Sequence, residues 1–296
     1  MLPKEIIRKV RRIEIQTRHL VNDVFSGEYH SVFKGRGMEF SEVREYQRGD
    51  SIKTIDWNVT ARMGHLFVKK FVEERELTVM LMVDASSSGR FGSQRKPKRE
   101  IAAEISALLA FSAIKNNDRV GLIIFTDEVE KFVPPKKGTK HVLRVIRELL
   151  YFQPRGRSTS ITAALEYLNR LTRRKAVVFL ISDFLDDGYQ RALRVANRRH
   201  DLVAVAIADP REQDLPPVGL VELEDAETGQ MVLANTSDDG FRRRFAEGNA
   251  RRLDERTRQF ASMNMDSVNI LVDDSEDPYI KPLMKFFRLR ARKLRV

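Results

Sequence analysis

The chain has 296 residues, of which 42% are hydrophobic and 32% are charged, with a formal net charge of +11 and no cysteine. A chain of this length can bury roughly three quarters of its unfolded surface, as one large domain or two smaller ones, and the composition excludes a disordered or low-complexity protein. The absence of cysteine excludes disulfides, thiolate zinc sites and cysteine nucleophiles, so any metal ligand must be an oxygen atom or an imidazole.

The first 75 residues are predicted to form a helix followed by an ordered segment. Apolar residues at alternating spacings of three and four predict an amphipathic helix over residues 3–25. Residues 27–65 combine glycines, paired Arg and Glu residues and the only tryptophan, which indicates an irregular segment held by ion pairs and a few buried rings. Alternating residues predict a strand at 66–72. We expect residues 1–75 to pack on the main domain.

From residue 77 onward the pattern alternates between strands and helices. Strands are predicted at 77–83, 120–125, 129–133, 176–181, 202–208 and 267–272. Helices are predicted at 99–115, 141–151, 161–171, 189–199 and 239–263. Several strands are apolar throughout, as expected for parallel strands that helices cover on both faces. This order predicts an α/β domain over residues 76–296, with a doubly wound, mainly parallel sheet and helices on both faces.

Two further segments complete the predicted domain. Residues 209–235 are predicted to form an inserted hairpin, and residues 278–296 a helix. Residues 281–296 carry seven Lys and Arg residues and no acid, so much of the net charge is terminal, which disfavours nucleic acid as a partner and leaves contact with a membrane surface open. No apolar run reaches the roughly 20 residues of a membrane span, and the N-terminus lacks a signal-peptide core, so we expect a cytoplasmic protein.

Three loops of the predicted domain carry acids and hydroxyls where strands end. Asp84, Ser86 and Ser88 follow the first central strand, residues 155–160 offer hydroxyls just before a helix, and Asp183 follows the strand 176–181. In an open parallel sheet, ligands bind beyond the carboxyl ends of the strands, where such loops converge. Carboxylate and hydroxyl oxygens suit Mg²⁺ or Mn²⁺. The sequence therefore predicts metal-dependent binding rather than catalysis.

Together these residues resemble the metal-ion-dependent adhesion site (MIDAS) of the von Willebrand factor A fold. The resemblance implies that Ser86 and Ser88 bind the metal directly, that Thr159 binds it directly or through water, and that Asp84 and Asp183 act largely through water. Because few carboxylates would bind the metal directly, Mg²⁺ or Mn²⁺ would stay electrophilic. The implied partner is a protein that supplies an acidic residue to the open position of the metal.

The second loop departs from the usual pattern of that fold. Members carry Gly-Gly-Thr where this chain has Arg157-Ser158-Thr159. Counting back from the following helix selects Thr159 as the ligand, and Ser158 is the alternative. Arg157 puts a positive charge near the metal, which would weaken cation binding or steer an acidic partner.

The segment between residues 35 and 73 carries motifs that resemble one particular group of A-domain proteins. Its motifs Gly-x-Gly-x-Glu-Phe, Arg-x-Tyr, Gly-Asp, Ile-Asp-Trp and Ala-Arg-x-Gly are similar to those of bacterial A-domain proteins associated with MoxR-type AAA+ ATPases. The resemblance covers about residues 25–210. It implies a non-enzymatic adaptor that works with a MoxR-type AAA+ ATPase in assembling or activating a partner complex.

Two other functions remain as alternatives. The first is a metal-independent scaffold whose basic C-terminal helix binds an acidic protein, nucleic acid or a membrane surface. The second is a metal-dependent hydrolase. The chain has no helical His pair at i, i+4, no Gly-x-Ser-x-Gly elbow and no Gly-x-x-x-x-Gly-Lys loop, so we expect no enzymatic activity.

Overall fold

The computed structural model describes residues 4–21, 29, 32–33, 39–72, 76–224, 229–275 and 277–293. The chain divides into two units, one formed by residues 1–32 and 78–296 and the other by residues 33–77. No helix among the described residues is both long enough and apolar enough to cross a membrane.

The larger unit is built on a six-stranded sheet. In spatial order its strands are β10 (Asp266–Leu271), β7 (Asp201–Ala208), β6 (Val177–Ser182), β3 (Thr78–Asp84), β4 (Arg119–Phe125) and β5 (Val129–Lys136). All neighbouring pairs are parallel except β4 and β5, which pair antiparallel at one edge. Strand β3 is central, and its last residues are aligned with the ends of β4 and β6. The predicted doubly wound, mainly parallel α/β fold is confirmed.

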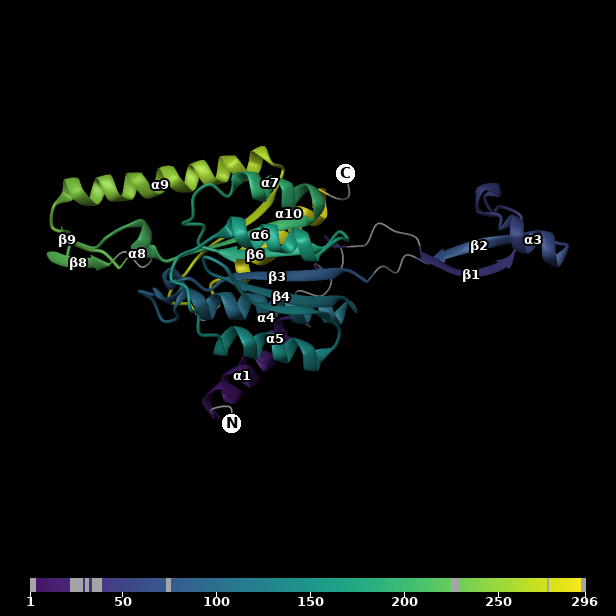
Figure 1. Ribbon diagram of the computed structural model, residues 1–296, viewed down its shortest axis with the longest axis horizontal. Helices are drawn as coiled ribbons and strands as arrows, with labels where there is room; N and C mark the ends of the chain where they lie inside the picture. The colour runs from purple at the N-terminus through teal and green to yellow at the C-terminus, as the bar shows by residue number, and fades with distance from the viewer. Residues whose placement is uncertain are drawn as a thin grey trace. The chain divides into compact units, whose positions relative to one another are not determined.

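Helices cover both faces of this sheet (Figure 1). On one face, α4 (Lys98–Lys115) and α5 (Thr139–Tyr151) contact the strands, and α1 (Lys4–Leu20) packs on both helices. On the other face lie α6 (Ile161–Leu171) and α7 (Gln190–Arg199). Two further helices, α9 (Asp239–Ser262) and α10 (Ile280–Lys293), contact the edge strand β10.

The strands are buried because both faces of the sheet are covered. Every residue of β6 is buried, as are the middle five of β3 and the middle six of β7, which explains why these segments are apolar throughout rather than alternating. Helix α4 is also buried on nearly every side, and not only on the single apolar face that its spacing predicted. The reason is that the sheet, α1 and α5 surround it, and the buried hydroxyls of Ser106 and Ser112 are satisfied by carbonyls one turn earlier.

The connection between β7 and α9 contains a short helix and a hairpin. Helix α8 (Pro210–Gln213) is followed by β8 (Leu220–Glu224) and β9 (Met231–Asn235), which pair antiparallel. The base of this hairpin is tied by Thr236, whose N–H and hydroxyl both donate to the Gly219 carbonyl at 2.8 Å. These elements lie beyond the carboxyl ends of the central strands (Figure 1).

The smaller unit is a two-stranded sheet with two short helices. Strand β1 (Glu39–Glu45) pairs antiparallel with β2 (Phe67–Val72), and η2 (Ile52–Thr54) and α3 (Trp57–Met63) lie between them in the chain. Asp56 caps α3 by accepting from the N–H groups of two residues in its first turn. The sequence pattern predicted β2 but not β1, because the glycine-rich, charged segment around β1 shows no regular alternation.

Candidate functional site

The loop after β3 holds three predicted site residues in a hydrogen-bonded turn. The N–H of Ser86 donates to Asp84 Oδ1 at 2.9 Å, and the hydroxyl oxygens of Ser86 and Ser88 lie 3.0 Å apart. The turn forms because an aspartate side chain can accept from the backbone two residues on, and the short helix η3 (Ser87–Arg90) follows it. Both serines are buried, at 2% and 6% exposure. Three oxygen-bearing side chains therefore meet at the end of the central strand.

The second predicted loop, residues 155–160, lies against the first. The N–H of Ser87 donates to the carbonyl of Arg157 at 2.9 Å. Thr159 is buried, and its Oγ1 has no hydrogen-bond partner among the residues that the structure describes, whereas Ser158 is only partly buried. Because a buried hydroxyl without a partner costs free energy, a bound ligand would relieve that cost at Thr159 and not at Ser158.

Gly156 allows the second loop to approach the turn between β4 and β5. A Cβ at this position would lie 1.9 Å from Asp127 Oδ1 and 2.5 Å from Thr126 Oγ1, and Thr126 is fully buried. We expect Gly156→Ala to displace the loop that carries Thr159 and to lower the free energy of unfolding by about 1–3 kcal/mol, as overpacking does. Urea denaturation measures this loss. Gly89→Ala is the control, since a Cβ there meets nothing within 4 Å, and an equal loss in both variants would contradict the expectation.

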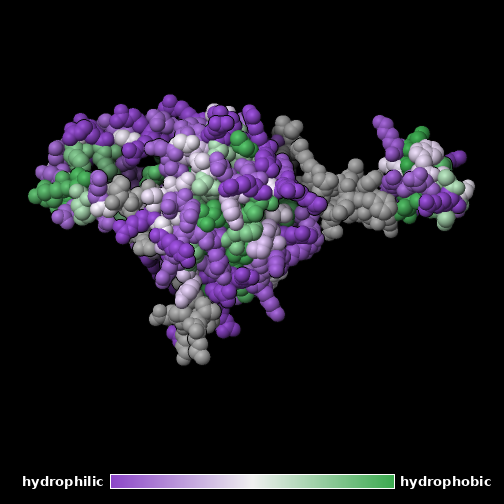
Figure 2. Space-filling model, viewed as in Figure 1, coloured by the Kyte–Doolittle hydropathy of each residue, from purple (hydrophilic) through white to green (hydrophobic). Residues whose placement is uncertain are grey.

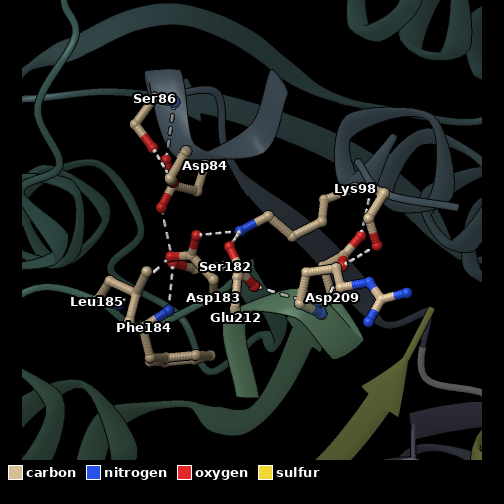
Figure 3. Close-up of polar contacts among 12 residues, drawn as sticks. Asp84, Ser86, Lys98, Ser182, Asp183, Phe184, Leu185, Asp209 and Glu212 are labelled. Atoms are coloured by element: carbon tan, nitrogen blue, oxygen red, sulfur yellow. Dashed lines mark hydrogen bonds and ion pairs between the residues drawn. The ribbon is translucent and has the colours of Figure 1, made fainter. Parts of the chain in front are cut away.

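Asp183, at the end of β6, is engaged by a buried lysine (Figure 3). Lys98 Nζ lies 2.8 Å from Asp183 Oδ2 and 2.5 Å from Glu212 Oε1. The Lys98 side chain is 4% exposed and that of Asp183 6%, whereas that of Glu212 is 25% exposed. Lys98 begins α4 and Glu212 lies on α8, so one ammonium group joins three elements. The sequence analysis selected Asp183 but neither of the other two residues.

Asp84 and Asp183 are held next to one another by neighbouring strands. The Ser182 hydroxyl donates to Asp84 Oδ2 at 2.7 Å and accepts from the N–H of Phe184 at 3.0 Å. Burial, together with the negative charge of Asp183, raises the pKa of Asp84 to about 6. Burial alone would lower the pKa of Lys98, but the charges of Asp183 and Glu212 outweigh it and raise that pKa. The site is thus a crowded group of charges in which the buried Lys98 ammonium contacts the Asp183 carboxylate and Arg256 donates to the Asp183 carbonyl at 2.8 Å.

Helix α8 is fixed in place by Asp209. This fully buried carboxylate accepts from the N–H of Ser93 at 2.7 Å, from the Ser93 hydroxyl at 2.5 Å and from the N–H of Arg211 at 2.9 Å. In return, Glu212 Oε2 accepts from the N–H of Asp209 at 2.9 Å, which completes a capping box. Glu212 therefore offers its other oxygen to Lys98 from a well-defined position.

The donor set is one that a hard divalent cation prefers. In the described part of the chain, no group of three or more His, Asp or Glu residues could hold a metal, so a carboxylate cage is absent there. What the loops offer instead are the hydroxyls of Ser86, Ser88 and Thr159, with the carboxylates of Asp84 and Asp183 close by. These residues fit Mg²⁺ or Mn²⁺, because such ions take hydroxyl, carboxylate and water oxygens and the Thr159 hydroxyl has no partner among the described residues.

A cavity of about 810 Å³ opens beside this group of residues. Its wall includes Ser88 and Asp183 of the site itself, most residues of the segment that follows β6, and several residues of α9. A cavity of this volume accepts several side chains of a partner or a small molecule. Of the five predicted site residues, Ser88 and Asp183 are therefore the two that this cavity exposes.

The hairpin next to the site exposes large apolar side chains. Figure 2 shows apolar atoms gathered over β8 and β9. Five residues of this region are more than half exposed, namely Val218, Leu220, Met231, Val232 and Leu233. Apolar side chains grouped in this way on a protein surface mark contact sites for other macromolecules.

Comparisons with known proteins place the chain among uncharacterized relatives. Residues 42–255 match the family model described as "Protein of unknown function DUF58". The uncharacterized protein Rv1480 of Mycobacterium tuberculosis is 33% identical over 244 residues, which is 81% of this chain and 77% of that protein. Similar solved structures include BatB from Bacteroides thetaiotaomicron, with a TM-score of 0.48 and 17% identity over 73% of this chain and 99% of that one. Another is proximal thread matrix protein 1 from the mussel byssus with a zinc-occupied MIDAS motif, with a TM-score of 0.37 and 16% identity over 46% of this chain and 39% of that one.

Proposed function

Because the chain belongs to the DUF58 family, for which no function is established, we propose its function from the site: a metal-ion-dependent protein-binding module without catalytic activity. The observation that carries the proposal is the contact between the Ser86 and Ser88 hydroxyls. The adjoining loop adds the buried Thr159 hydroxyl, which has no partner among the described residues, and Ser88 and Asp183 line a cavity. The mostly parallel six-stranded sheet with helices on both faces is consistent with a von Willebrand factor A-like fold, which supports a role in protein interaction.

The residues would divide the work between holding a cation and balancing its charge. Ser86, Ser88 and Thr159 would bind Mg²⁺ or Mn²⁺ directly, and Asp84 and Asp183 would act largely through water. When bound, the ion supplies an electrophilic position that a carboxylate of a partner protein can occupy. Asp84 would need to be ionised, and a nearby divalent charge favours that form. The apolar side chains of β8 and β9 would add contact area to the same face.

A second part of the proposal concerns the partner. The motifs between residues 35 and 73 support an adaptor that works with a MoxR-type AAA+ ATPase in assembling or activating another complex. We expect a purified MoxR-type ATPase from the same organism to bind the wild-type chain in Mg²⁺ and to dissociate in chelator, in a surface-binding assay. Binding that survives chelator but is lost at high salt would instead favour the metal-independent scaffold.

The basic C-terminal helix gives that scaffold little support. Leu283, Phe286 and Phe287 of α10 are buried. Arg290 is held by ion pairs with Asp201 and Asp266. Part of the positive charge of this helix is therefore neutralised within the protein, which leaves less of it for an acidic partner or a membrane.

Thermal unfolding with Mn²⁺ and with chelator measures cation binding directly. At a Mn²⁺ concentration 100 times the dissociation constant, the free energy of unfolding of the wild-type protein should rise by about 2.7 kcal/mol. The rise is expected because the ion binds only the folded state. Asp84→Ala and Thr159→Val should abolish or reduce this gain. Thr159→Val is nearly isosteric and removes a hydroxyl without a partner, so its stability in chelator should not fall. Ser158→Ala is the matched control and should keep the gain. A wild-type protein that Mn²⁺ does not stabilise would refute the metal site.

A further inference from the structure

Lys98 places a positive charge next to Asp183, a carboxylate that a bound cation would also attract. Its ammonium group is within hydrogen-bond distance of Asp183, one of the five proposed cation-site residues, and its side chain is almost completely buried. The ammonium also bonds Glu212, which is not among those residues (Figure 3). An internal cation thus already neutralises one carboxylate of the site in the metal-free protein.

We propose that Lys98 sets the affinity of the cation site by competing with the bound ion for Asp183, and that Glu212 is the alternative partner that lets Lys98 release it. This inference rests on the proposed cation site. Two positive charges that share one carboxylate repel each other, and the repulsion is strong where water is excluded. An ion that enters the site, even one that reaches Asp183 through water, must therefore weaken the contact between Asp183 and the ammonium.

Glu212 is suited to the role of alternative partner. Its Oε2 atom is held by the N–H of Asp209, so the Oε1 atom stays at its position on α8 whether or not Asp183 contacts Lys98. A buried ammonium without any carboxylate is strongly unfavourable, and Glu212 removes that penalty when the metal weakens the contact with Asp183. Without Glu212, Lys98 would have only Asp183 and would hold it more tightly.

The dissociation constant of Mn²⁺, followed by electron paramagnetic resonance of the free ion, tests both roles. In Lys98→Gln/Glu212→Gln the formal charge equals that of the wild type, but no ammonium contacts Asp183. We expect this variant to bind Mn²⁺ about tenfold more tightly, within the usual range of coupling between two sites. Equal or weaker binding by the folded variant overturns the proposal.

A second pair of variants covers the case in which the double variant does not fold. Glu212→Gln should weaken Mn²⁺ binding by more than Asp187→Asn does. Asp187 is an exposed carboxylate of the same cavity, so both changes remove one negative charge, but only the first leaves Lys98 with a single partner. Equal weakening by the two changes contradicts the role of Glu212.

The outcomes separate this inference from the proposed function. If the wild type binds Mn²⁺ and the double variant binds it no better, only the role of Lys98 fails. If the double variant binds Mn²⁺ and the wild type does not, Lys98 replaces the metal in the natural protein, and the metal-dependent function fails instead. If neither folded protein binds Mn²⁺, both proposals are refuted.

Discussion

Replacing Lys98 with methionine is expected to lower the free energy of unfolding by about 3–5 kcal/mol, the usual cost of removing one partner from a buried ion pair. Methionine fills a similar volume, so the loss comes from charge and not from a cavity. With the ammonium gone, Asp183 loses its lysine partner in a nearly buried position next to Asp84. Glu212 loses the same partner but is partly exposed, so water can solvate it. Guanidinium denaturation at neutral pH measures the loss.

Two further variants separate this effect from a general effect of losing a lysine. Lys131 forms an ion pair with Glu148 at 3.2 Å, but its side chain is 40% exposed. Lys131→Met should therefore cost less than about 1 kcal/mol, as surface ion pairs do. In Lys98→Met/Asp183→Asn the uncompensated carboxylate is gone, so part of the lost stability should return. If Lys98→Met costs no more than Lys131→Met, the buried ion pair does not stabilise the protein as the distances indicate.

The central sheet could be predicted because its signals are local. The segments that became β3, β6 and β7 are short, apolar throughout and separated by helical patterns, and only a parallel sheet covered on both faces suits such strands. Once the order of the strands is known, the places where Asp84 and Asp183 lie follow from the rule that parallel strands end at the same edge. For the same reason, residues on the loops that follow these strands could be predicted as site residues from the sequence.

The charge balance of the site could not be predicted in this way. Asp183 lies 85 residues after Lys98 in the sequence, and Glu212 lies 114 residues after it. No local sequence pattern can therefore link these three residues. One signal was available. Lys98 begins a helix, where the helix dipole disfavours a cation, and such a residue needs a nearby carboxylate to be stable there. That signal identifies a residue in need of a partner, but not which carboxylate meets it.

Asp84→Asn is expected to make the metal-free protein more stable at pH 8 by about 2–3 kcal/mol. The pKa of Asp84 is raised from its ordinary value of 3.8 to about 6 by burial and by the charge of Asp183. Between those two values the folded protein holds a proton that the unfolded chain has released, so stability falls as pH rises through this window. Above it the penalty is constant, and a difference of about two pKa units corresponds to about 3 kcal/mol. Asparagine carries no charge and keeps an acceptor for the N–H of Ser86.

Denaturation in chelator from pH 4 to pH 8 measures the difference in free energy of unfolding between Asp84→Asn and the wild type. This difference should be small at pH 4 and reach its full size by about pH 7. Asp187→Asn, at an exposed carboxylate of the same cavity, should leave the pH dependence unchanged. If the stability difference between the wild type and Asp84→Asn did not vary with pH, the surroundings would not raise the pKa of Asp84. Saturating Mg²⁺ should reverse the order, since it stabilises only the protein that keeps Asp84. The residue that weakens the metal-free protein would then be the one that the cation requires, which is a physical reason for a binding site to retain an unfavourable charge.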